Sequence, residues 1–108
     1  MTKFVGVTAC IAGLAHTYMA KTNLEKYAKK EGIDVKIEAQ GSMGVENKLS
    51  QDEIDEADLV IFAVDTNVTE RDRFSEKQIF EVGTNQVIKD GEKVIKDASK
   101  MVENEKGN

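Results

Sequence analysis

The 108-residue sequence contains no proline, no tryptophan, one cysteine and one histidine. A single cysteine cannot form an internal disulfide, and one cysteine with one histidine cannot supply the four ligands of a structural zinc site. We therefore expect neither a metal nor a cofactor. The nucleotide-binding pattern G-x-x-x-x-G-K-[ST] is absent, and no G-x-G-x-x-G follows the first predicted strand.

The sequence also lacks a basic stripe and a long apolar run. Its formal net charge is −5, so nucleic acid is not an expected partner. Because it shows no signal peptide and no apolar run of membrane-spanning length, we expect a cytoplasmic protein without direct membrane insertion. The length and the 40% hydrophobic content fit one domain, predicted over 1–103 and followed by a frayed tail over 104–108.

Strand and helix signals alternate along the chain. Apolar, β-prone runs predict strands over 4–9, 59–64 and 78–82, and alternation predicts a half-exposed edge strand over 33–38. Helical spacing predicts helices that end at Gly32, run over 50–57 behind a Ser50–Glu53 capping box, and begin at Thr84 with a break near Gly91. The pattern predicts an α/β fold: a four-stranded parallel sheet flanked by helices in three layers, with an anion-binding loop after the first strand.

That first loop holds the only cysteine and the only histidine. It reads Cys10-Ile11-Ala12-Gly13-Leu14-Ala15-His16-Thr17 and joins the first strand to the first helix. The first N–H groups of a helix have no intrahelical acceptors, and the helix dipole is positive at that end, so a phosphate or a thiolate is stabilised there. A helix N-terminus lowers the pKa of a thiol. Cys10 is therefore a candidate nucleophile, although a lone cysteine after an apolar strand is more often an inert buried residue.

Three polar residues follow the predicted strands at the same edge of the sheet. Gln40 and Ser42 lie after the second strand, and Asp65 follows the run over 59–64. Ligands of open α/β sheets bind outside the carboxyl ends of the strands, so these side chains are candidates to line the site. Turn chemistry explains Gln40 and Ser42 equally well, and strand termination explains Asp65.

Other polar residues near this edge also have two interpretations. His16 is either a phosphate ligand or a residue that hydrogen-bonds the loop backbone. The Thr17 hydroxyl either binds phosphate or turns to solvent. Arg71 and Arg73 either meet an acidic partner or a transferring phosphate, or they are ordinary exposed loop charges, which is the default.

Several motifs in order resemble one known family. The loop from Cys10 resembles the C-P-T-G-I-A-H-T loop of the fructose-family IIB domains of the bacterial phosphoenolpyruvate-dependent sugar phosphotransferase system. Four later segments are similar to that family's E-T-Q-G-S-x-G, E-N-x-L, A-D-x-V-I-x-A-x-D and R-F-x-x-K motifs, and they lie at 38–44, 46–49, 57–65 and 73–77. Ile11 and Ala12 stand where the family usually has proline and threonine.

The resemblance implies a phosphoryl relay. Cys10 would receive phosphate from a phosphohistidine on an EIIA domain and pass it to a sugar, fructose or a related hexose, held by the membrane permease EIIC. Residues 11–17 would form the phosphate-binding loop, with no cofactor and no metal. The domain would be cytoplasmic and would reach the membrane when engaged with EIIC.

Two other functions remain alternatives. The spacing Cys10-x₅-His16-Thr17 is close to the C-x₅-R-[ST] loop of cysteine-dependent phosphatases, but the arginine that would clamp phosphate bidentately is missing. A phosphatase of this kind would have low activity. The second alternative is a non-catalytic binding or regulatory module that keeps the fold.

Overall fold

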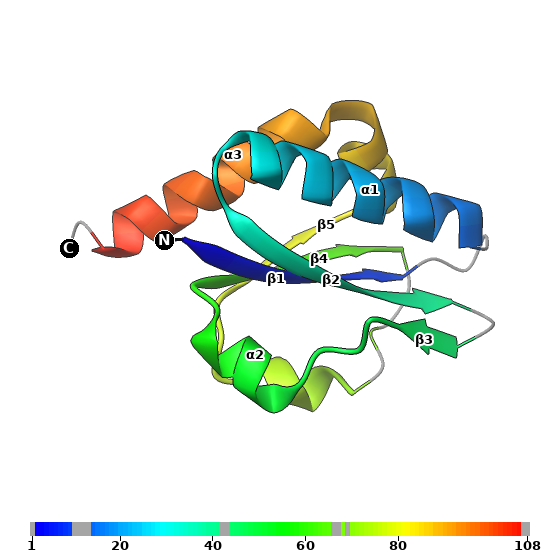
Figure 1. Cartoon of the computed structure of the whole chain (residues 1–108), viewed down its shortest axis with the longest axis horizontal. Helices are drawn as coiled ribbons and strands as arrows, with labels where there is room; N and C mark the ends of the chain where they lie inside the picture. Colours follow the sequence, from blue (N-terminus) through cyan, green and yellow to red (C-terminus); the bar gives the residue numbers. More distant parts are fainter. Residues whose placement is uncertain (1, 10–13, 42–43, 66–67, 69, 107–108) are drawn as a thin grey trace.

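The computed structural model describes residues 2–9, 14–41, 44–65, 68 and 70–106. The strands are β1 (Lys3–Ala9), β2 (Asp34–Gly41), β3 (Gly44–Glu46), β4 (Leu59–Val64) and β5 (Ile79–Val82). The helices are α1 (Leu14–Lys30), α2 (Gln51–Glu56) and α3 (Thr84–Lys106), with a 3₁₀ turn, η1 (Arg71–Phe74). Figure 1 shows α1 and α3 on one face of the sheet and α2 on the other.

The sheet has the order β3-β2-β1-β4-β5. β2, β1, β4 and β5 are parallel, as predicted, while β3 runs antiparallel to β2. The predicted four-stranded sheet therefore has a fifth strand. The second strand was predicted to end at residue 38, whereas β2 continues to Gly41 because residues 39 and 40 pair with both β1 and β3, and Gly41 pairs with β3.

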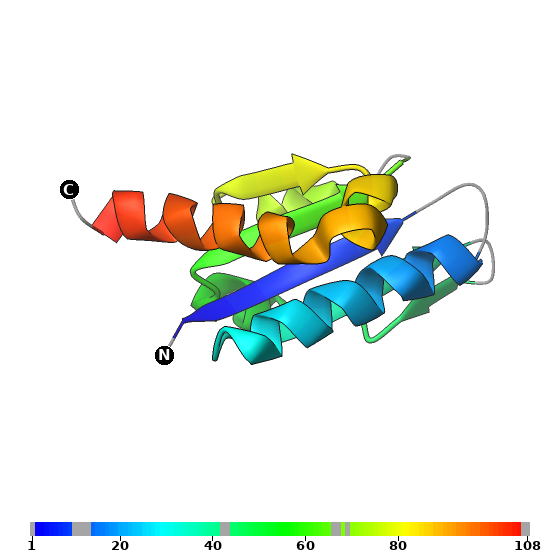
Figure 2. The ribbon, with the colours of Figure 1, turned by 90° about the horizontal axis from the view of Figure 1, so that it is seen from above.

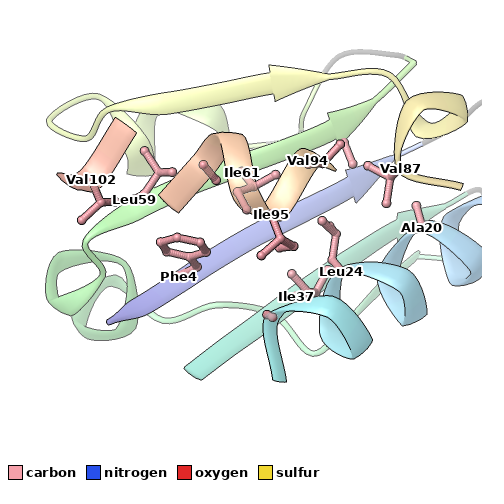
Figure 3. Packing of buried hydrophobic residues seen from close by; sticks show 13 residues of the cluster. Phe4, Ala20, Leu24, Ile37, Leu59, Ile61, Val87, Val94, Ile95 and Val102 are labelled. Carbon is pink, nitrogen blue, oxygen red and sulfur yellow. The ribbon is translucent and has the colours of Figure 1, made fainter. Parts of the chain in front are cut away.

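Two apolar clusters hold the layers together. The larger cluster lies between the sheet and the helices α1 and α3, which run side by side across it (Figure 2). Figure 3 shows Phe4 of β1 and Ile61 of β4 packed under Leu24 of α1 and Ile95 of α3. The smaller cluster packs α2 and η1 against the other face, with the rings of Phe62 and Phe74 edge to face at 5.1 Å.

Local sequence signals set most element boundaries. The Ser50–Glu53 capping box is present at the start of α2, and Gly32, with φ +72°, follows the end of α1. α3 is kinked at Asp90, whose carboxylate accepts from Lys93 N–H as the cap of the second part. The helix continues to Lys106, past Asn104 where the frayed tail was predicted to begin, because buried Val102 anchors its last turns to the sheet.

Candidate functional site

The carboxyl ends of β1, β2 and β4 meet at one edge of the sheet, on the right in Figure 1. In the strand register, Ala9 lies between Gln40 of β2 and Val64 of β4. Asp65 N–H donates to Ala9 C=O at 2.9 Å. The strand that leads to Cys10 therefore ends between the backbones of Gln40 and Asp65, so these two predicted site residues flank the start of the loop.

The N-terminus of α1 lies at the same edge. Leu14, Ala15, His16 and Thr17 form its first turn, and no acidic residue occurs in that turn. Since the helix has 17 residues, its dipole places partial positive charge at this end, and the first amides have no intrahelical acceptors. This arrangement favours an anion beside the loop after β1.

Two buried hydroxyls on either side of that loop have no hydrogen-bond partner within the described part of the chain. Thr8 of β1 is 0% exposed, and Thr17 of α1 is 1% exposed. Burying a hydroxyl without a partner costs about 1–3 kcal/mol, so such groups are rare and call for an explanation. Thr17 was predicted as a phosphate-binding residue, whereas no sequence pattern pointed to Thr8.

Gln40 is 6% exposed, and its amide belongs to a buried network. Gln40 Nε2 donates to Glu38 Oε2 at 2.6 Å, and Leu49 N–H donates to Glu38 Oε1 at 2.8 Å. Arg73 completes the network with two hydrogen bonds of 2.9 Å, one to each Glu38 oxygen. Burial raises the pKa of the Glu38 carboxyl, but the hydrogen bonds from Arg73, Gln40 and Leu49 outweigh it and hold that pKa below its ordinary value.

Asp65 is exposed, yet both of its carboxylate oxygens accept from Thr84 at the start of α3. Thr84 N–H donates to Asp65 Oδ1 at 3.1 Å, and the Thr84 hydroxyl donates to Oδ2. The carboxylate thus caps α3 from another strand, which satisfies a first-turn amide and meets the positive end of the helix dipole. This capping role adds a structural explanation to the predicted site-lining one.

Some predicted site residues lie outside the described residues. These are Cys10, Ile11, Ala12, Gly13 and Ser42. Among the described residues, no group of three or more His, Cys, Asp or Glu side chains gathers in a way that would hold a metal ion. Within the same residues, no helix has the length and apolar character needed to cross a membrane.

Comparison with known proteins decides the family. The family model "PTS system, Lactose/Cellobiose specific IIB subunit" matches residues 5–97. The "PTS system fructose-like EIIB component 2" of Escherichia coli is 42% identical over 95 residues, covering 88% of this chain and 90% of that protein. The chain belongs to the PTS IIB family. It is a fructose-like EIIB component and has the phosphotransferase role of these components in sugar transport.

Other relatives agree with the IIB assignment. The solution structure of an Enzyme IIB subunit of the PTS from Escherichia coli superimposes with a TM-score of 0.91 at 35% identity, covering 97% of each chain. The "PTS system fructose-specific EIIB'BC component" of Xanthomonas campestris is 42% identical over 96 residues, which are 89% of this chain but 16% of that longer one. The IIB unit therefore also occurs fused to other PTS domains.

The network around Arg73 is a feature near this edge that no sequence pattern predicted. An exposed loop charge was the default interpretation of Arg73, but its side chain is 13% exposed and the Glu38 side chain is 0% exposed. Glu38 was predicted to lie on the exposed face of an edge strand. Two of the partners of Glu38, Leu49 and Arg73, are 11 and 35 residues away, and no local pattern shows that such residues will meet. The guanidinium fork is directed at the Glu38 carboxylate.

Proposed function

We propose that this IIB domain carries phosphate on Cys10, taken from a phosphohistidine on EIIA and passed to a sugar held by EIIC. The observation that carries the proposal is the buried, unpartnered hydroxyl of Thr17 in the first turn of α1. It lies at the end of a helix whose dipole favours an anion, seven residues after the only cysteine. A phosphoryl oxygen is the acceptor that this hydroxyl lacks.

The chemistry consists of two displacements at phosphorus. The Cys10 thiolate attacks the phosphoryl group, and the P–S bond forms as the P–N bond breaks. The histidine, protonated on its other ring nitrogen, leaves with the electron pair as neutral imidazole. A sugar hydroxyl then attacks phosphorus, the P–S bond breaks, the thiolate is regenerated, and the hydroxyl proton leaves to a base. The chain contributes positioning and charge stabilisation through the α1 amides and Thr17.

Exposed apolar side chains near the same edge support a transient partner. Tyr18 and Met19 in the first turns of α1 and Val45 on β3 are 37%, 49% and 42% exposed. The Tyr18 hydroxyl hydrogen-bonds Glu46, which ties the start of α1 to β3. EIIA has to bring its phosphohistidine to Cys10, so it has to contact the surface around this edge. The fusion in the Xanthomonas relative also supports work beside other PTS domains.

Intact mass spectrometry tests the proposal. The protein is incubated with phosphoenolpyruvate, the general PTS proteins and a fructose-family EIIA, with Cys10→Ser as the matched control. One added phosphoryl group on the wild type and none on the variant is the expected result. An unmodified wild type, or equal modification of both proteins, would contradict the proposal.

The sugar is a separate part of the proposal. We propose fructose, because the relatives are named fructose-like. Membrane vesicles that contain the cognate EIIC are supplied with phosphorylated protein and with fructose, mannose or cellobiose. Fructose phosphate is the expected product, and discharge by another sugar alone would replace fructose while leaving the relay intact. We also propose that the domain is cytoplasmic and lies at the membrane when it engages EIIC.

A further inference from the structure

The Glu38–Arg73 pair joins three segments around the edge where β1 ends. Glu38 lies on β2, and Arg73 lies in η1, after β4. Besides its two bonds to Glu38, Arg73 donates to Leu49 C=O at 3.2 Å from Nη1 and to Glu70 C=O at 3.0 Å from Nε. Its guanidinium also lies 5.0 Å from the centre of the Phe74 ring. One side chain thus holds β2, the stretch before α2 and the turn after β4 in a fixed arrangement.

Stability alone does not account for this pair. Desolvating two charges offsets much of their attraction, so apolar residues of similar size would stabilise the fold about as well. What apolar residues would not do is hold the Gln40 amide, which donates to Glu38 Oε2. Gln40 lies opposite Ala9 in the strand register, and Ala9 directly precedes Cys10. The pair therefore orients the buried amide of Gln40, on the residue paired with Ala9.

Charge gives the pair a second effect. Glu38 is a fully buried carboxylate on the strand next to the one that leads to Cys10. A phosphoryl group brings further negative charge to this edge, and a buried carboxylate without a counter-ion would repel it through a medium of low dielectric constant. The Arg73 fork neutralises both Glu38 oxygens at once.

We propose that Glu38 and Arg73 are positioning residues for phosphoryl transfer to Cys10, acting through the buried amide of Gln40. Neither residue contacts the phosphoryl group: Arg73 holds Glu38 and neutralises it, and Glu38 holds Gln40. The inference rests on the proposed function of Cys10. It predicts a defect in the transfer step rather than in the binding of EIIA.

The first test uses Arg73→Met, with Arg71→Met as the matched control. Arg71 lies in the same turn, but its ion pair with Glu81 is exposed, with side chains 52% and 53% accessible. Single-turnover transfer from phosphorylated EIIA is measured over a range of EIIA concentrations. We expect Arg73→Met to lower the maximal rate about 10- to 100-fold with little change in half-saturating EIIA, because displaced positioning groups cost rate. Arg71→Met should transfer at the wild-type rate.

The second test separates positioning from folding. In Glu38→Leu/Arg73→Met no buried charge is left uncompensated, so this variant should fold, while the Gln40 amide loses the Glu38 acceptor. Urea unfolding verifies the fold, and transfer should remain slow. In a Gln40→Ala background, Glu38→Leu/Arg73→Met should slow transfer much less than it does in the wild type, because both changes remove the same orientation and neither leaves a buried charge.

The outcomes distinguish this inference from the proposed function. A wild-type maximal rate in Arg73→Met, or a folded Glu38→Leu/Arg73→Met variant with normal transfer, overturns the positioning role while Cys10 remains the carrier. The positioning role is also overturned if the rate losses of Gln40→Ala and of Glu38→Leu/Arg73→Met multiply when the changes are combined. The pair would then act independently of Gln40. If no phosphoryl group reaches the wild-type protein, both proposals fail.

Discussion

Replacing Thr17 by valine should make the domain more stable and should slow phosphoryl transfer to Cys10. Thr17 is 1% exposed and its hydroxyl has no partner within the described part of the chain, so its burial costs about 1–3 kcal/mol. Valine has nearly the same shape, and its helix propensity is close to that of threonine. We expect Thr17→Val to raise the free energy of unfolding by about 1 kcal/mol, measured by urea unfolding.

The same substitution should slow phosphoryl transfer. A hydrogen bond from Thr17 to a charged phosphoryl oxygen would contribute about 1.5–3 kcal/mol, and about 1.4 kcal/mol corresponds to a tenfold change in rate. Thr17→Val should therefore reduce the single-turnover rate of transfer to Cys10 by about 10- to 100-fold. The gain in stability and the loss in rate have one cause, which is a hydroxyl kept without a partner until phosphate arrives.

Thr8→Val is the matched control. Thr8 has the same kind of buried, unpartnered hydroxyl, but it lies on β1 and outside the proposed phosphate-binding residues. Thr8→Val should also gain about 1 kcal/mol, since valine suits a strand, and should transfer at the wild-type rate. The reasoning is refuted if Thr17→Val destabilises the domain, or if it is stabilised and transfers phosphate as fast as the wild type.

Three further predictions concern the fold. Ser50→Ala removes the capping box of α2 and should cost about 1 kcal/mol in urea unfolding; an unchanged midpoint would show that the cap contributes nothing. The ammonium of Lys36, 2.8 Å from the Glu53 carboxylate, and the Ser50 N–H lower the pKa of Glu53 from its ordinary 4.5 to about 2. The stability from that shift is therefore complete above pH 4.5 and lost as pH falls towards 2. An NMR titration of Glu53 with a wild-type midpoint near 4.5, or with the same midpoint in Lys36→Met, would contradict it. Gly6→Ala would place a Cβ 2.7 Å from Ile37 Cδ1 and 3.1 Å from a backbone oxygen, so it should lower the thermal midpoint through overpacking of about 1–3 kcal/mol, and an unchanged midpoint would contradict that close approach.

Features set by neighbouring residues could be predicted from the sequence. The capping box at Ser50 depends on a partner three residues away, and it is present. The continuous apolar run over 59–64 predicted a central strand, and β4 lies between β1 and β5 with its side chains buried on both faces. The break near Gly91 was also predicted, and the kink occurs at Asp90. In each case the energetic cause lies within a few residues.

Features that depend on distant partners could not be predicted. Strand β3 has only three residues, all exposed, and owes its pairing to β2, so no apolar pattern marks it. Alternation over 33–38 placed Glu38 on a solvent-facing side, whereas Arg73, 35 residues later, allows its burial. The cap that Asp65 forms on α3 could not be predicted either, because it depends on Thr84, 19 residues later. A charged residue at a strand end can be interpreted as lining a site or as stabilising the fold until its partners are known.

Carboxylates at the edge where β1 ends are compensated within the fold, which lets a domain with net charge −5 accept an anion there. The carboxylates of Glu38 and Asp65 lie near the carboxyl end of β1, and each meets positive charge within the fold: Glu38 meets the Arg73 fork, and Asp65 meets the first amide of α3. The first turn of α1 adds no acidic residue, so its dipole is not cancelled locally. The carboxylates are thus compensated while the hydroxyl of Thr17 is left unpartnered, and this combination favours an arriving anion over a cation.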